Sequence, residues 1–253
     1  MLKTRLIPSL LLANGRCVKG VRFDDYRDVG HPVTAAKVYE AQGADELLFL
    51  DIRASDEGRA TLLDTVTQTA EQCFMPLTVG GGVRTVDDIR TLLRAGADKV
   101  SINTAAFARP ELIAEGAAEF GDQCIVVSID HIADSTGTQR VALDSGKRMT
   151  DVDPVEWAQR AADLGAGEIL FTSVEREGAR GGYDIDTIRR VADTVSVPVI
   201  AAGGAGSLQD LVDVVAQGHA SAVAAASIFH FTDQSPIKAH SFMKQAGLDV
   251  RMA

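Results

Sequence analysis

The chain has 253 residues, of which 46% are hydrophobic and 24% are charged, the composition of an ordinary globular protein. No apolar run reaches the ~18 residues of a membrane span, so we do not expect a membrane protein. The first residues lead into a strand-like stretch without a signal-peptide pattern, so no secretory leader is expected. A net charge of −10 argues against non-specific binding to nucleic acid, because a phosphate backbone would be repelled.

The cysteines predict a reducing environment. Cys17, Cys73 and Cys124 are odd in number and form no CxxC motif, so neither a disulfide framework nor a zinc site is expected. The His, Asp and Glu residues show no spacing typical of a metal site either. We therefore expect a cytoplasmic protein that uses no metal and no organic cofactor.

Eight apolar runs of strand length alternate with amphipathic segments of helical period. The runs cover 6–12, 47–52, 77–79, 99–102, 124–129, 169–172, 199–202 and 222–225. The helical segments include 85–95, 153–164, 183–195 and 207–217. Continuous rather than alternating apolar runs indicate strands that are buried on both faces, as in a parallel sheet. Eight such units predict an α/β fold, a closed (β/α)8 barrel.

An internal repeat relates the two halves of the chain. Residues 43–49 resemble 165–171, and residues 76–82 resemble 198–204. Both pairs, and the glycines Gly96 and Gly218, are offset by 122 residues. That period is too long for a solenoid and fits a duplicated half-barrel. Because no linker-like segment separates the halves, we expect one barrel domain over residues 1–253, with half-barrels at about 1–122 and 123–253.

Glycine-rich loops follow the third and seventh predicted strands, on the side where barrel enzymes have their active sites. Glycines there let backbone N–H groups approach an anion, and hydroxyl and amide groups follow the fourth and eighth strands. The alternative is that these glycines only form tight turns. Because the loops occur twice at equivalent places, we predict a ligand with a phosphate at each end. The candidate phosphate-binding residues are Gly81, Gly82, Asn103, Thr104, Gly178, Gly203, Gly204, Ala226 and Ser227.

Two carboxylates lie at predicted strand ends, where partial burial raises a pKa toward the range needed for general acid–base catalysis. Asp51 ends the second strand and Asp130 ends the fifth. Their alternative role is to hold loops by accepting hydrogen bonds from backbone amides. The first strand ends without an acid. Lys19 lies in the long segment 14–32 that follows it, which is predicted either to close over an anionic substrate or to be a solvated loop.

Four charged residues lie near the starts of predicted strands, at the opposite end of the barrel: Arg5, Glu46, Lys99 and Glu168. Charges at a barrel floor are costly unless they are paired, and two cations with two carboxylates can form a closed ring. The ring is interpreted either as a structural plug or as a polar gate through which a small molecule passes along the barrel axis.

Together these motifs resemble the cyclase subunit of imidazole glycerol phosphate synthase, over essentially the whole chain. The matching segments are 14–20, 45–51, 78–82, 97–105, 165–170 and 202–206. The resemblance implies a (β/α)8 barrel that pairs with a glutaminase subunit at the N-terminal face of the barrel. It also implies that ammonia enters through a charged gate and reacts at the mouth with a substrate that carries two phosphates.

Carried over to the matching positions, the resemblance makes the four floor residues the ammonia gate and places Asp98 at the glutaminase interface. It makes Lys19 the lysine of a mobile loop and Asp130 the catalytic aspartate of the fifth strand. The family's other catalytic aspartate, on the first strand, is replaced by Leu11. Leucine transfers no proton, and a general acid or base contributes ~10²–10⁴ in rate, so ordinary cyclase activity is not expected.

Other segments look more like a paralogous group of barrels associated with sugar amidation in bacterial surface-polysaccharide synthesis. These are residues 8–12 and 153–158. In that group, the resemblance implies, the barrel and its glutaminase deliver ammonia to a third protein. The segments 18–20 and 26–28 are closer to the histidine-pathway branch, and Glu177 replaces an Asp that is common in the family.

Three hypotheses follow from these features. The first is a synthase (lyase-type) subunit of a glutamine amidotransferase, which channels ammonia to the amidation of a surface-polysaccharide sugar. The second is an authentic cyclase of histidine biosynthesis, which converts a bisphosphorylated ribulosyl intermediate and ammonia into imidazole glycerol phosphate and an aminoimidazole carboxamide ribotide. The third is a non-catalytic regulator of the glutaminase that holds a phosphorylated ligand.

Overall fold

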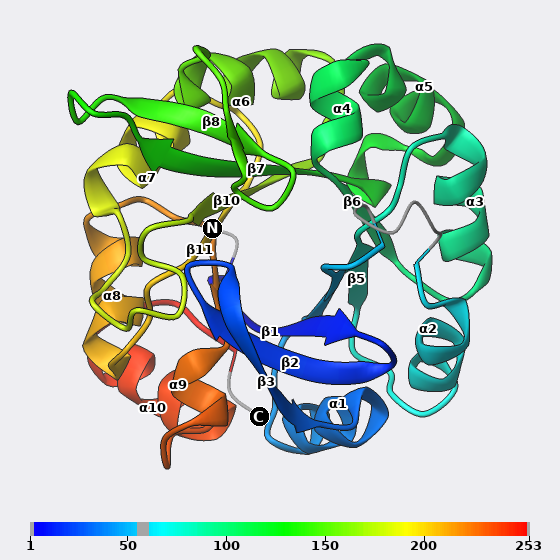
Figure 1. Ribbon diagram of the computed structural model, residues 1–253. Coiled ribbons are helices and arrows are strands. Elements are labelled where there is room, and N and C mark those ends of the chain that lie inside the picture. The colour runs from blue at the N-terminus through cyan, green and yellow to red at the C-terminus, as the bar shows by residue number, and fades with distance from the viewer. Residues whose placement is uncertain (1–2, 55–60, 252–253) are drawn as a thin grey trace.

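The computed structural model describes residues 3–54 and 61–251. Eight parallel strands close into a barrel, which confirms the predicted (β/α)8 fold (Figure 1). The barrel strands are β1 (Arg5–Ala13), β4 (Leu47–Asp51), β5 (Leu77–Gly80), β6 (Lys99–Ile102), β7 (Ile125–Ala133), β10 (Glu168–Ser173), β11 (Val199–Ala202) and β12 (Ala222–Ala225). Each pairs in parallel with the next in this order, and β12 pairs with β1 to close the ring. All eight coincide with the apolar runs, because such strands are covered on both faces.

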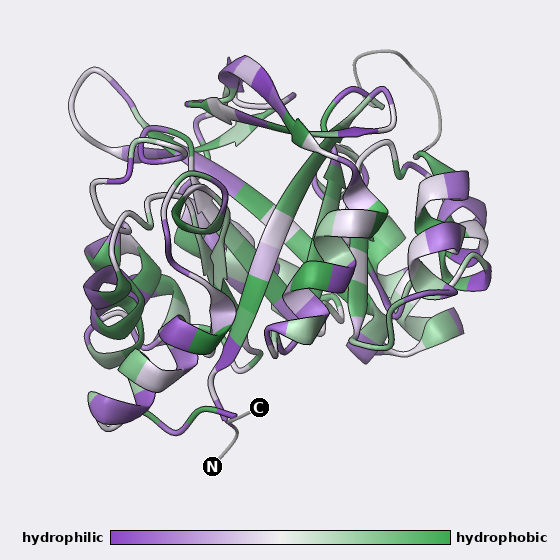
Figure 2. Ribbon diagram, turned by 90° about the horizontal axis from the view of Figure 1, so that it is seen from below, coloured by the Kyte–Doolittle hydropathy of each residue, from purple (hydrophilic) through white to green (hydrophobic). Residues whose placement is uncertain are grey.

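Helices surround the barrel on the outside (Figure 1). They are α1 (Pro32–Ala41), α2 (Leu63–Ala70), α3 (Val86–Arg94), α5 (Glu111–Phe120), α6 (Pro154–Asp163), α7 (Ile185–Ala192), α8 (Leu208–Ala216) and α10 (Pro236–Gln245), with the shorter α4 (Thr104–Ala108), η1 (Asp122–Cys124) and α9 (Ser227–His230). Their apolar faces and the outer faces of the strands form the main hydrophobic core. Figure 2 shows hydrophobic residues along the strands and hydrophilic residues on the outer helix surfaces. None of the helices in the described ranges has the length and apolarity needed to cross a membrane.

The predicted starts of three helices are confirmed by N-caps. The side chains of Thr85, Asp153 and Ser207 each accept a hydrogen bond from a backbone N–H in the first turn of α3, α6 and α8. Thr85 and Ser207, which are 122 residues apart, also form reciprocal capping boxes with Asp88 and Asp210. The 122-residue repeat of the sequence therefore has the same capping hydrogen bonds in both halves of the chain.

The segment 14–32 is mostly two strands, so its interpretation as one long loop is wrong. β2 (Arg16–Val21) pairs antiparallel with the end of β1 and with β3 (Asp24–Gly30). The hairpin begins at Asn14 and Gly15, whose φ angles of 52° and 73° suit those residue types. A second extension, β8 (Gln139–Leu143) and β9 (Arg148–Met149), pairs antiparallel with the end of β7. Each half of the chain thus has an antiparallel extension after its first strand.

The capping box of α8 provides a test of this local structure. We expect Ser207→Ala to lower the free energy of unfolding by about 1 kcal/mol, because the backbone N–H of Asp210 loses its acceptor. Ser207→Asn keeps a capping oxygen and should change the stability much less. Urea denaturation followed by circular dichroism measures the difference, and equal midpoints for the two variants would contradict the assigned cap.

Candidate functional site

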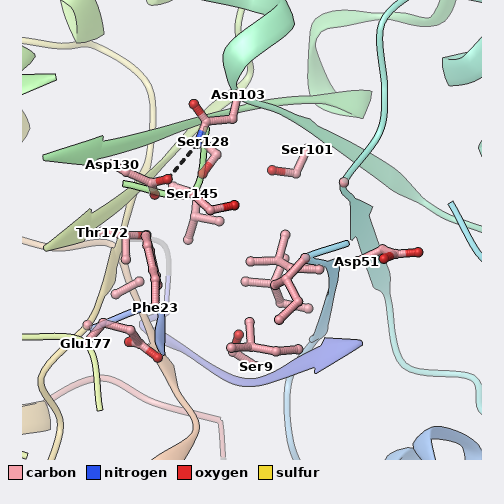
Figure 3. Close-up of a pocket in the computed structure, with 18 of the residues that line it drawn as sticks. Ser9, Phe23, Asp51, Ser101, Asn103, Ser128, Asp130, Ser145, Thr172 and Glu177 are labelled. Atoms are coloured by element: carbon pink, nitrogen blue, oxygen red, sulfur yellow. Dashed lines mark hydrogen bonds between the residues drawn. The ribbon is translucent and has the colours of Figure 1, made fainter. Parts of the chain in front are cut away.

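A cavity of about 560 Å³ lies at the C-terminal ends of the barrel strands (Figure 3). All nine candidate phosphate-binding residues line it. Those that follow β5 and β6 lie across the mouth from those that follow β11 and β12, because these strand pairs are opposite each other in the eight-strand ring. The structure therefore brings the candidates together around one space, on two opposite sides.

Two of the loop glycines are required by the backbone itself. Gly81 has a φ of +100°, and a Cβ there would lie 2.1 Å from the carbonyl oxygen of Asp51. Its counterpart in the repeat, Gly203, has a φ of +81°, and a Cβ would lie 2.7 Å from the carbonyl oxygen of Ser173. Only glycine fits both the backbone angles and the close approach. The glycine pattern alone therefore does not distinguish an anion site from a tight turn.

The two sides of the mouth differ in charge. Among the described residues that line the cavity, the cations are Arg84 and Arg109, which follow β5 and β6. The loops after β11 and β12 contribute glycine, alanine and Ser227 instead. The β5–β6 side thus has backbone N–H groups and guanidinium groups near the cavity, although Arg109 is paired with Glu115 at 2.7 Å. The other side offers uncharged groups.

Asp130 combines burial with a defined hydrogen bond. Its carboxylate accepts from Asn103 Nδ2 at 2.8 Å, the contact drawn in Figure 3. Burial raises the pKa of Asp130 to about 7; the Asn103 hydrogen bond acts in the opposite direction, and the negative charge of Glu177 adds to the rise. A carboxyl group that titrates near neutral pH can both take up and release a proton during a reaction. This is the property expected of the predicted acid–base residue.

Leu11 lies across the barrel from Asp130, because β1 and β7 are opposite strands. Its side chain is almost fully buried and lines the same cavity. It packs in an apolar cluster with Val18, Leu50 and Ile52 rather than beside a polar partner. The structure thus shows an apolar surface across the barrel from Asp130.

Lys19 is buried in an ion pair with Glu177, on the loop between β10 and α7. The backbone N–H of Arg22 also donates to the carbonyl oxygen of Glu177, at 2.8 Å. These contacts hold the β2–β3 hairpin at the mouth, where Phe23 and Tyr26 line the cavity. Lys19 itself is not among the lining residues, so the structure places it beside the cavity.

Asp51 lies on the other side of the cavity from Asp130 (Figure 3). Its Oδ1 accepts hydrogen bonds from the backbone N–H groups of Arg53 and Ala54, at 3.2 and 3.1 Å. The side chain is buried and lines the cavity. These bonds are the loop-holding role that the sequence offered as the alternative to catalysis.

The four charged residues of the barrel floor form a closed ring, as their pairing in the sequence predicted. Arg5 contacts Glu46 and Glu168 at 2.7 and 2.8 Å, and Lys99 contacts the same two carboxylates at 3.0 and 3.1 Å. Thr78 adds a hydrogen bond to Glu46 at 2.7 Å. Burial acts to lower the pKa of Arg5, but the two carboxylates outweigh it and raise that pKa above its usual value.

Asp98 lies at the same end of the barrel, directly before β6. Its Oδ2 accepts a hydrogen bond from the backbone N–H of Leu77 at 2.8 Å. The residue is exposed, so it is available at the N-terminal face of the barrel. Its Oδ2 nevertheless holds the first residue of β5 and is not directed at a partner protein.

Only one layer of side chains separates the ring from the cavity. The cavity extends down to Leu48 and Leu170, which follow Glu46 and Glu168 by two residues on their strands. Successive inward-facing side chains on a strand are two residues apart, so these leucines form the next layer above the ring. The apolar cluster inside the barrel consists of Ile7, Leu48, Val126, Leu170, Ile200, Ala202, Ala222 and Ala224.

The sequence reasoning missed a group of hydroxyl side chains above this apolar layer. They are Ser9, Ser128 and Thr172, which line the cavity together with Ser101 on β6. Period-two counting from the strand tips would have found them, since Ser9 and Ser128 lie two residues before Leu11 and Asp130. It also missed Glu177 as a cavity residue, because a loop residue has no such period. In the described ranges, no cluster of three or more His, Cys, Asp or Glu residues is placed to hold a metal ion.

Fold and site together define a (β/α)8-barrel protein with a buried acid at the mouth and paired charges at the floor. The chain matches the family described as histidine biosynthesis protein over residues 5–235. It therefore belongs to the histidine biosynthesis protein family. The match covers all eight barrel strands and both ends of the barrel.

The raised pKa of Asp130 predicts a pH dependence of stability. The folded protein keeps this proton up to about pH 7, whereas an unfolded Asp releases it near about pH 3.9. The folded state thus binds more protons in this range, and its stability falls as the pH rises from about 4 to 7. We expect Asp130→Asn, which can still accept from Asn103, to remove this part of the fall.

Urea unfolding at pH 5 and pH 8 measures the effect. The loss of unfolding free energy between the two pH values should be smaller in Asp130→Asn than in the unmodified protein. The exposed-acid variant Asp186→Asn is the control and should behave like the unmodified protein. Equal losses in all three proteins would show that Asp130 ionises normally.

Proposed function

We propose that this chain is the synthase subunit of a cytoplasmic glutamine-dependent amidotransferase. A glutaminase docks at the N-terminal face, and its ammonia passes the charged ring into the cavity. There it serves the amidation of a sugar in bacterial surface-polysaccharide synthesis, together with a third protein. The observation that carries the proposal is an intact ring of paired charges below a cavity in which Asp130 faces Leu11 instead of a second acid.

The ring supports passage of a small neutral molecule. Each cation is shared by both carboxylates, so moving one side chain aside leaves every remaining charge with an opposite partner. Lys99 is the best candidate to move, because its flexible stem ends in a single ammonium group, whereas the planar guanidinium of Arg5 is fixed by two directional contacts.

The interior above the ring supports the same conclusion. Uncharged ammonia enters an apolar layer more easily than ammonium, because burying an unpaired charge is very costly. The apolar cluster inside the barrel contains three alanines, Ala202, Ala222 and Ala224, which fill less of the barrel axis than larger residues would. Above it, Ser9 and Thr172 offer hydrogen-bond partners at the lower part of the cavity.

The mouth supports amidation in the paralogous pathway rather than histidine-pathway cyclisation. The family resemblance assigns two carboxylates to ring closure, one on each of two opposite strands. Here one of the two positions holds Leu11, which is packed against other apolar side chains. The remaining acid, Asp130, can handle a single proton near neutral pH. Proton transfer from the β1 side of a substrate is therefore not available at this mouth.

The missing acid gives the first functional test. With a glutaminase partner and the histidine-pathway intermediate, we expect cyclisation at least ~10²-fold slower than by an authentic cyclase, because one acid–base group is absent. Leu11→Asp should raise this rate, and Leu11→Asn, of similar size but without an ionisable group, should not. Turnover close to that of an authentic cyclase, or rescue of a cyclase-deficient histidine auxotroph, would support histidine biosynthesis instead.

The ring gives the second functional test. We expect Lys99→Met to lower the amount of amidated product formed per glutamine hydrolysed in the complex with the glutaminase, because ammonia leaks at the interface. Product formation from added ammonium salt should fall much less. Lys99→Arg keeps the cation, and Lys244→Met changes a lysine in the last turn of α10; both serve as controls. Unchanged coupling in Lys99→Met would favour a non-catalytic regulator of the glutaminase.

A further inference from the structure

The cavity has two chemically different sides. The side formed by β6, β7 and β10 presents polar groups, among them Asn103, Ser128, Asp130 and Thr172. On the side formed by β1 and β4, Leu11, Leu50 and Ile52 present carbon surface. Asp51 lies on the same side, where its Oδ1 accepts hydrogen bonds from two backbone N–H groups, and Ser9 lies lower in the cavity. This division does not follow from phosphate binding, which would need only the loop glycines and nearby donors.

The apolar side is a continuous cluster. Leu50 and Ile52 are half-buried and line the cavity, and they pack with Leu11 and Tyr26. Burial raises the pKa of Tyr26 to about 12, so its hydroxyl is uncharged throughout the physiological range. A ligand group on this side therefore meets hydrocarbon and a neutral aromatic ring.

Phe23 lies at the mouth of the cavity beside Thr172 and Glu177 (Figure 3). Its φ is +61°, a left-handed conformation that bulky residues rarely adopt, and the preceding Arg22 also has a positive φ. Arg22 and Phe23 are the two residues that join β2 to β3, and positive φ angles at both positions suit a two-residue hairpin turn. On its outer side Phe23 meets the second extension: a Cβ on Gly146 would lie 3.2 Å from Phe23 Cδ2. Contacts from both extensions thus hold the ring at the cavity.

This arrangement selects among ligands. A hydroxyl group placed against the apolar side loses its hydrogen bonds to water without replacement, whereas a methyl group gains by leaving water. The opposite side supplies hydroxyl, amide and carboxyl groups that match the hydroxyl groups of a sugar. The volume of about 560 Å³ is within the range of small-molecule sites.

We propose that the cavity binds a phosphorylated sugar that carries a methyl group where a common sugar carries a hydroxymethyl group. The sugar hydroxyls face Asp130 and Asn103, and the methyl group lies on Leu50 and Ile52. The inference rests on the proposed function for the phosphate-binding role of the loops, and it adds the class of sugar.

A matched pair of ligands tests this inference without any partner protein. Isothermal titration calorimetry compares 6-deoxyglucose 1-phosphate with glucose 1-phosphate, which differ by one hydroxyl group, and inorganic phosphate reports on the loops alone. We expect the deoxy sugar phosphate to bind about tenfold more tightly than glucose 1-phosphate, as is typical for one misplaced polar group in an apolar subsite. Equal affinities, tighter binding of glucose 1-phosphate, or no binding of either sugar would overturn the inference.

Variants of the apolar side locate the preference. Leu50→Asn, of similar size but polar, should remove the preference for the deoxy sugar while leaving the affinity for inorganic phosphate unchanged. Leu50→Met keeps the apolar character and should keep the preference. If Leu50→Asn does not fold, Ile52→Asn replaces it, since this side chain is also half-buried at the cavity. A preference that survives both polar substitutions would also overturn the inference.

The outcome is separable from that of the proposed function. Equal binding of the two sugars together with uncoupling by Lys99→Met would reject the sugar class and leave the amidotransferase proposal standing. A clear preference for the deoxy sugar, together with unchanged coupling in Lys99→Met, would support the sugar class and count against the amidotransferase proposal.

Discussion

The requirement that buried charge be paired governs both ends of this barrel. At the floor, Arg5, Glu46, Lys99 and Glu168 come from four different strands, and each contacts two partners of opposite sign. Removing one partner of such a buried set costs about 3–5 kcal/mol, because the other charges stay buried. The ring therefore fixes the relative positions of β1, β4, β6 and β10 at their starts.

At the mouth the same requirement is met differently. Asp130 is buried with an amide partner, Asn103, and no cation in the described ranges is paired with it. Burial therefore favours its protonated form and raises its pKa to about 7. Lys19, the lysine of the β2–β3 hairpin, is paired with Glu177 and not with Asp130. The paired charges at the floor stay ionised and hold the strands together. Asp130 has no paired cation in the described ranges, so its pKa is shifted toward the range in which it can transfer a proton.

The fold could be predicted because it depends on local, repeated patterns, and the ring because charges near the strand starts must be paired. Burial on both faces leaves continuous apolar runs, and the 122-residue offset places equivalent residues at equivalent strand positions. The β2–β3 hairpin was missed because its residues 24–30 are mostly polar and exposed, so they carry no burial pattern. Asn103 was predicted to bind phosphate, but its amide Nδ2 donates to Asp130, a side-chain choice that no sequence spacing encodes.

Leu11 shows how the mouth of this barrel can differ in chemistry without any change at the floor. Leu11 lies six residues beyond Arg5 on β1, so the apolar layer at Ile7 and the hydroxyl layer at Ser9 separate it from the ring. A charge removed at the mouth therefore leaves the floor pairs untouched. It does change what faces Asp130, because an apolar surface there excludes a second proton donor and favours ligand groups that do not need water.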